Sequence, residues 1–119
     1  MLIKGARSFA FERIVQKMSQ KAHNTVLEIN LNAMAHNLKT YRSLLKPKTK
    51  IMAMVKAFAY GSDAEQIALH LQKLNVDYFA VAFTSEGVAL RDAGITKPIL
   101  VLHPQPVTFK TVIDRCLEP

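Results

Sequence analysis

Residues 51–74 decide the fold, and they read IMAMVKAFAYGSDAEQIALHLQKL. The stretch opens with an apolar run at 51–55 that shows no polar alternation, which predicts a strand buried on both faces. Its second half repeats apolar residues at helical spacing, and this pattern predicts a helix. The helical stripe consists of Ala64, Ile67, Ala68, Leu71 and Leu74.

The same strand-and-helix unit follows twice more. Apolar runs at 78–83 and 99–102 predict two further strands. A helix is expected around 86–93, with Gly94 as its C-cap. After the last strand, helical spacing returns in Phe109, Val112, Ile113 and Cys116.

An earlier unit precedes residue 51. Residues 25–29 alternate in polarity, which is typical of a strand. Asn30 or Asn32 is expected to cap the next helix, and Pro47 to stop it. One buried face is expected on this helix, formed by Leu31, Met34, Ala35, Leu38, Tyr41 and Leu45.

Alternating strands and helices predict a parallel sheet with right-handed crossovers. A doubly wound sheet and a (β/α)8 barrel both begin in this way. Three regular units cannot close an eight-stranded barrel, which takes about 250 residues, so the chain is interpreted as a fragment. Such a fragment exposes strand edges and apolar interior, and is therefore expected to self-associate. Strands are expected near 25–29, 50–56, 78–83 and 98–102.

Composition supports a folded domain. Of 119 residues, 50% are hydrophobic and 21% are charged, which excludes a disordered chain. Cys116 is the single cysteine, so no internal disulfide forms, and no secretory leader pattern is present at the N-terminus. We therefore expect a cytoplasmic protein. No apolar run approaches the roughly 20 residues of a membrane span.

The net charge of +7 is concentrated in the first part of the chain. Residues 1–50 hold ten Lys or Arg and two acids, whereas the remainder holds six and seven. The bases cluster only around Pro47, as Lys46, Lys48 and Lys50. A solvated turn explains this cluster better than a phosphate-binding patch, because no aromatic residue interleaves it. A basic nucleic-acid-binding module remains an alternative function.

Lys56 is the candidate for chemistry. It is the only charge between Lys50 and Asp63, and it lies where an apolar strand ends. Active sites of parallel α/β folds form at this edge of the sheet. A lysine partly withdrawn from water there becomes a better nucleophile, because its ammonium form is destabilised. The alternative is a lysine whose side chain extends from the strand end into solvent.

The loop after Lys56 leads directly into the next helix. Ser62 and Glu65 have the spacing of a capping box, with Ser62 as the N-cap. Tyr60 lies between them and the lysine, where its hydroxyl either reaches an anion or packs on the rim of the sheet. No metal-ligand spacing is present, and the scattered histidines are interpreted as structural or exposed. These are His23, His36, His70 and His103.

At this point the sequence resembles a known family. Residues 55–61, VKAFAYG, resemble the pyridoxal-phosphate attachment motif of bacterial alanine racemases, usually V-K-A-N-A-Y-G-H-G. Residues 28–38 are similar to that family's first strand and helix. Two later stretches, 79–95 and 98–102, are similar to its next barrel units. The resemblance covers roughly 25–119 and implies the N-terminal part of a (β/α)8 (TIM) barrel.

The resemblance implies roles for two residues. Lys56 would hold pyridoxal 5'-phosphate and act as one of two acid/base groups, and Tyr60 would bind the phosphate. Phe58 replaces the motif's Asn, and Ser62 and Asp63 replace its His-Gly, so other loop contacts differ. The family's second base is a Tyr from the partner subunit of a homodimer, and this chain does not contain it. The isolated chain is therefore expected to be inactive, while the parent enzyme would convert L-alanine to D-alanine.

The first residues resemble a different protein. Residues 2–12, LIKGARSFAFE, are similar to the C-terminal end of the Mur ligase that adds D-alanyl-D-alanine to a peptidoglycan precursor. This implies a fused ATP-dependent ligase and racemase for cell-wall synthesis. Residues 1–22 would be the ligase end and linker, and 23–119 the incomplete barrel. A small single-domain pyridoxal-phosphate-binding barrel is the alternative, and it gives residues 1–20 no role.

Overall fold

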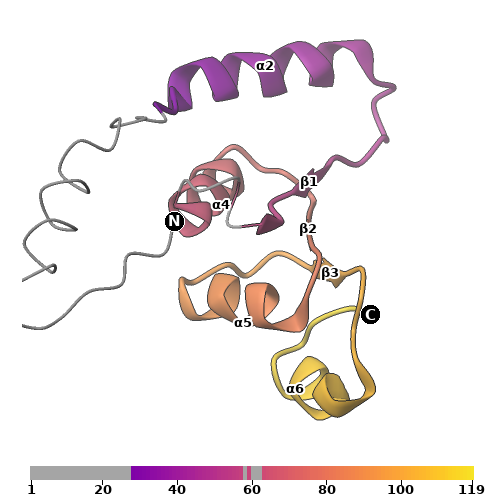
Figure 1. Cartoon of the computed structure of the whole chain (residues 1–119). Helices are drawn as coiled ribbons and strands as arrows, with labels where there is room; N and C mark the ends of the chain where they lie inside the picture. The colour runs from indigo at the N-terminus through magenta and orange to yellow at the C-terminus, as the bar shows by residue number, and fades with distance from the viewer. Residues whose placement is uncertain (1–27, 58, 60–62) are drawn as a thin grey trace, which may run out of the picture.

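The computed structural model describes residues 28–57, 59 and 63–119. Within them, strands and helices alternate, and the strands form one parallel sheet in the order β1-β2-β3 (Figure 1). The strands are β1 (Met52–Met54), β2 (Tyr78–Val81) and β3 (Ile99–Val101). The helices are α2 (Leu31–Leu44), α4 (Ala64–Lys73), α5 (Thr84–Asp92) and α6 (Phe109–Asp114), with the 3-10 turn η2 (Pro106–Thr108) before α6.

The parallel α/β alternation predicted from residue 51 onward is confirmed, although each strand is shorter than its apolar run. Ala80 sits at the centre of the sheet, paired with Met54 of β1 and Leu100 of β3. Parallel pairing continues on the far side of β3, where the N–H of Glu118 donates to the carbonyl of Ile99 at 2.8 Å. The sheet therefore begins to pair again beyond β3.

The strand predicted at 25–29 falls mainly outside the described residues, which begin at Glu28. Glu28 and Ile29 themselves are not in a strand. The cap prediction is resolved in favour of Asn30, whose side chain accepts a hydrogen bond from the Ala33 N–H at 3.0 Å. Asn30 thus satisfies one of the free amides at the start of α2.

One face of the sheet forms the core. Phe79, Val81, Ile99 and Val101 are at most 1% exposed, and they alternate along β2 and β3 as strand geometry requires. Side chains from three helices cover them, and α4 and α5 lie next to one another beside the strands (Figure 1). Each fully buried side chain contributes roughly 1.5–3 kcal/mol. The covering residues are Ile67, Ala68, Leu71, Leu90 and Val112.

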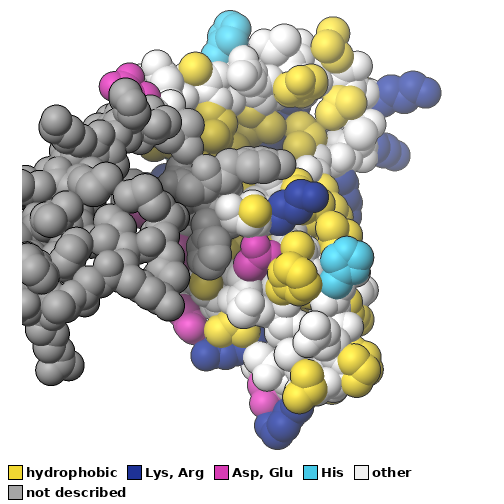
Figure 2. Space-filling model, in the orientation of Figure 1, with side chains coloured by type: hydrophobic (Ala, Val, Ile, Leu, Met, Phe, Trp, Pro, Cys, Tyr) yellow, Lys and Arg dark blue, Asp and Glu magenta, His cyan; other side chains and the backbone are white. Residues whose placement is uncertain are grey.

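The opposite face of the sheet, called the open face below, is exposed at its margins, although Ala80 at its centre is buried. Met52, Met54 and Leu102 are 47%, 48% and 43% exposed. The prediction that the run at 51–55 is buried on both faces is therefore wrong for β1, because no described element covers this side. Figure 2 shows hydrophobic side chains interrupting the polar surface over the strands. The expectation that a barrel fragment exposes apolar interior is confirmed.

Helix α2 is less buried than its pattern predicts. None of its residues is fully buried, and Tyr41 is 68% exposed. Leu31, Met34 and Leu38 alone of the predicted stripe pack against the core, because the helix leans on α4 rather than on the sheet. Arg42 secures its far end by donating to the carbonyls of Leu74 and Asn75 at 3.1 and 2.9 Å.

Helices α5 and α6 each end just before a residue with positive φ. The C-cap of α5 is Ala93, one residue before the predicted Gly94, which follows it with φ of 96°, as is typical of a glycine just after a C-cap. After α6, however, Cys116 has φ of 49° and is exposed, so it does not continue the predicted apolar stripe. The turn at Cys116 places Leu117 in the core instead, against Gly87.

No helix in the described residues is long and apolar enough to cross a membrane.

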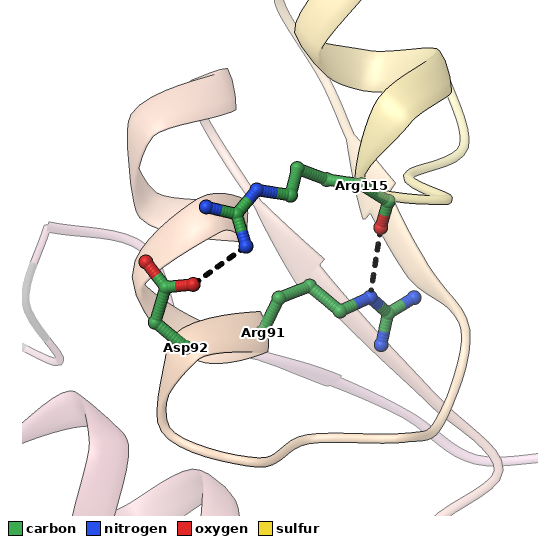
Figure 3. Close-up of polar contacts among 3 residues, drawn as sticks. All are labelled: Arg91, Asp92 and Arg115. Atoms are coloured by element: carbon green, nitrogen blue, oxygen red, sulfur yellow. Dashed lines mark hydrogen bonds and ion pairs between the residues drawn. The ribbon is translucent and has the colours of Figure 1, made fainter.

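Arg91 of α5 joins two loops to its own helix. Its guanidinium donates to the carbonyls of Ile95 and Lys97, at 2.8 and 2.7 Å, and to those of Arg115 and Cys116, at 3.1 and 2.8 Å. Figure 3 shows this side chain beside Arg115, which forms a 2.7 Å ion pair with Asp92. The Arg115 side chain is 45% exposed, so solvent weakens that ion pair.

We expect Arg91→Ala to lower the free energy of unfolding by about 2–4 kcal/mol, because four carbonyls lose a charged donor. Arg115→Ala is the matched control and should cost less than about 1 kcal/mol, since it removes only an exposed ion pair. Urea denaturation of both variants measures the difference. Equal losses would show that Arg91 does not hold the loops together.

Candidate functional site

Lys56 lies at the carboxyl end of β1. The preceding residue, Val55, still pairs with the sheet, since its N–H donates to the carbonyl of Ala80 at 2.9 Å. Alternation places Lys56 on the same face as Met54, away from the helices. Lys56 is exposed, which favours the alternative of a lysine whose side chain extends from the strand end into solvent over one partly withdrawn from water. The reason is that no described element covers that face.

The backbone after Lys56 adopts an uncommon conformation. Ala57 and Ala59 have φ of 54° and 50°, in the left-handed region that alanine rarely occupies. The Ala59 N–H donates to the carbonyl of Lys56 at 3.0 Å, which closes a tight turn. A left-handed alanine costs roughly 1–2 kcal/mol. Phe58, Tyr60, Gly61 and Ser62 lie outside the described residues, and the role expected for Tyr60 is therefore not tested.

The carboxylate of Glu86 stabilises this turn from the next unit. One oxygen accepts a hydrogen bond from the Ala57 N–H at 2.6 Å. The other accepts from the N–H groups of Ala82 and Phe83, at 2.8 and 3.0 Å. Glu86 thus joins the loop after β1 to the loop after β2 through charge-assisted hydrogen bonds. The only signal in the sequence is an acidic residue in the first turn of a helix that follows a strand.

The start of α4 differs from its prediction. Asp63 is the N-cap, and its side chain accepts from the Gln66 N–H at 3.2 Å. The predicted capping box from Ser62 to Glu65 is therefore wrong by one position. Asp63 and Asn30 cap their helices in the same way, through the amide three residues later.

A small cavity lies behind the Lys56 loop, on the helix side of the sheet. Its volume is about 120 Å³, below the roughly 300–1,000 Å³ of cofactor and small-molecule sites. It is therefore too small to hold a cofactor. Its lining consists of Val55, Asp63, Ala64, Glu65, Glu86, Ala89 and Leu90.

The remaining candidates do not join this site. His36 and His103 are exposed, and the Nε2 atom of half-buried His70 lies 3.1 Å from the carbonyl of Leu31. His23 lies outside the described residues. Among the described ranges, no group of His, Cys, Asp and Glu side chains is arranged to hold a metal.

The lysine cluster forms an exposed turn, as predicted. Lys46 and Lys48 are exposed on either side of Pro47. Lys50 is also exposed, and its Nζ lies 5.6 Å from the centroid of the Tyr78 ring. This distance is typical of a cation–π contact. Lys50 therefore contributes to packing at the start of β2.

Comparison with known proteins identifies the family. The family model for the alanine racemase N-terminal domain matches residues 29–119. The chain belongs to this family. The match confirms the resemblance and the assignment of the parallel strands to part of the alanine racemase barrel.

The relatives of this chain are considerably longer. The serine/alanine racemase of Enterococcus gallinarum is 42% identical over 86 residues, which is 72% of this chain and 12% of that protein. The alanine racemase of Citrifermentans bemidjiense is 46% identical over 78 residues, 66% of this chain and 21% of that protein. The solved alanine racemase of Clostridium difficile 630 superposes with a TM-score of 0.72 and 43% identity, covering 79% of this chain and 26% of that one. The chain therefore spans only a small part of each relative.

The left-handed turn after Lys56 can be tested by glycine substitution. We expect Ala57→Gly to leave stability unchanged or to raise it by up to about 1 kcal/mol, because relief of strain outweighs the gain in unfolded-state entropy. Ala89→Gly, inside α5, should instead lower it by about 1 kcal/mol. Thermal unfolding of both variants measures the contrast. A loss in Ala57→Gly as large as that in Ala89→Gly would contradict a left-handed Ala57.

Proposed function

We propose that this chain is the first part of the catalytic barrel of a pyridoxal-phosphate-dependent alanine racemase. The observation that carries the proposal is the place of Lys56 within the family motif, at the carboxyl end of a parallel strand. Parallel α/β folds assemble their active sites at this edge. The racemase family of residues 29–119 supports the reaction class.

The chemistry of Lys56 fits the cofactor. Lys56 is exposed, and no hydrogen bond occupies its amine among the described residues. A primary amine is the group that bonds covalently to an aldehyde. Lys56 would hold the cofactor, and the resemblance assigns the phosphate to the hydroxyl of Tyr60.

When bound, pyridoxal phosphate supplies an electron sink for the charge that develops as alanine loses its α-proton. The Nζ atom of Lys56 would take up or return that proton on one face of the substrate. Inversion requires a second acid/base group on the opposite face. The family resemblance assigns that group to a tyrosine of a partner subunit in a homodimer.

The open apolar face favours association of this chain with itself. Met52, Met54 and Leu102 remain in contact with water when the chain is alone. Burying them against a second copy would remove apolar surface from water at roughly 25 cal/mol per Å². We therefore propose a self-associating chain and a homodimeric parent enzyme.

The proposal extends to the segment before the barrel. Residues 1–22, which lie outside the described residues, would be the end of a Mur ligase and a linker, and 23–119 the racemase barrel. The order of the two motifs supports this, and D-alanine is the building block that such a ligase uses as a dipeptide. The surrounding reading frame tests the fusion. It is contradicted by the absence of an ATP-dependent ligase upstream or of a β domain downstream.

Covalent trapping tests the role of Lys56. The chain is mixed with pyridoxal phosphate, reduced with borohydride and mapped by peptide mass spectrometry. We expect a weak adduct that is richer at Lys56 than at Lys73, an exposed lysine of α4, and no production of D-alanine. Lys56→Ala should remove that adduct, whereas Lys73→Ala should leave it.

Two results would contradict the assignment. Turnover of alanine by the isolated chain would show that the second base is not missing. A full-length Lys56→Ala protein that still racemises alanine would exclude Lys56 from the reaction.

A further inference from the structure

We propose that Glu86 is the positioning residue for Lys56, and this rests on the proposed function of Lys56. The carboxylate of Glu86 holds the backbone that follows the lysine, and the amine is thereby kept on the open face of the sheet. Glu86 does not touch the reacting atoms. It acts through the peptide group of Ala57.

The backbone of Lys56 is fixed on both sides. On its N-terminal side, Val55 is hydrogen-bonded to Ala80 of the central strand at 2.9 Å. On its C-terminal side, the Ala57 N–H is hydrogen-bonded to Glu86 at 2.6 Å. The unfavourable φ of Ala57 persists only where surrounding contacts impose it. The hydrogen bond that the Ala57 N–H donates to Glu86 is a contact that acts on this residue directly.

Glu86 is itself held in place. Its second oxygen accepts from Ala82 and Phe83, which connect β2 to α5. The side chain is half-buried in the first turn of α5, where the positive end of the helix dipole stabilises a carboxylate. A carboxylate fixed by two neighbouring amides is a rigid support for a third.

Glu65 provides a matched control. It lines the same small cavity as Glu86 and also lies in the first turn of its helix, α4. It is exposed, and it forms no hydrogen bond to the described residues of the Lys56 loop, Ala57 and Ala59. Replacing Glu65 therefore changes the charge beside the loop without removing a hydrogen bond to these two residues.

The first measurement needs no cofactor. Amide hydrogen exchange in the whole chain is followed by NMR, with the buried Phe79 amide as the reference for global unfolding. Relative to that reference, Glu86→Ala should accelerate exchange at Ala57 by about tenfold, because a charge-assisted hydrogen bond is lost. Glu86→Gln should restore part of the protection through its amide oxygen, and Glu65→Ala should change nothing.

The second measurement separates positioning from a merely structural role. Borohydride trapping with pyridoxal phosphate gives the ratio of adduct at Lys56 to adduct at Lys73 in each variant. We expect this ratio to fall at least about threefold in Glu86→Ala, because the amine is no longer held in one place. It should recover partly in Glu86→Gln and stay unchanged in Glu65→Ala.

Other results of the exchange and trapping measurements each overturn a specific claim. Unchanged exchange at Ala57 in Glu86→Ala overturns the positioning role. So does faster exchange with an unchanged ratio, since Glu86 would then only stabilise the loop. A ratio of one in the unmodified chain overturns the proposed function of Lys56, and the positioning role with it.

Discussion

Burial of one sheet face under α4, α5 and α6 is the constraint on which the rest of the structure depends. Phe79, Val81, Ile99 and Val101 are removed from water on that side. Parallel strands connected by helices leave the other side to further strands of a barrel. Successive side chains of a strand point to opposite faces of the sheet. The alternation that buries the core residues therefore directs Lys56 to the open side.

Polar side chains bind the backbone of loops at both ends of the strands. At the amino ends, Arg91, Gln72 and Asp77 bind backbone groups of the loops that lead into β3 and β1. These contacts satisfy loop amides and carbonyls that the sheet leaves unpaired. At the carboxyl ends, Glu86 performs this task for the loop that follows Lys56. In barrels of this type, the first end serves stability and the second serves chemistry.

Local patterns predicted much of the fold, because local interactions decide those features. The apolar runs located all three described strands, and helical spacing located α2, α4 and α6. Capping chemistry placed a helix end near Gly94 and a helix start at Asn30 or Asn32, and the structure selected Asn30. The prediction failed where two neighbouring candidates compete, as with Ser62 and Asp63. It also failed at Cys116, because the positive φ of this residue turns the backbone so that Leu117 is buried instead.

The sequence by itself determined the order of strands and helices, the family and the candidate lysine, because each of these depends on residues that are close together in the sequence. Tertiary structure decided which sheet face is open, how exposed Lys56 is and which carboxylate supports its loop. Glu86 lies 29 residues from Ala57 in the chain. Only the parallel pairing of β1 with β2 brings the ends of the two strands together. A contact made by such pairing has no local sequence pattern, since its two partners belong to different strand–helix units.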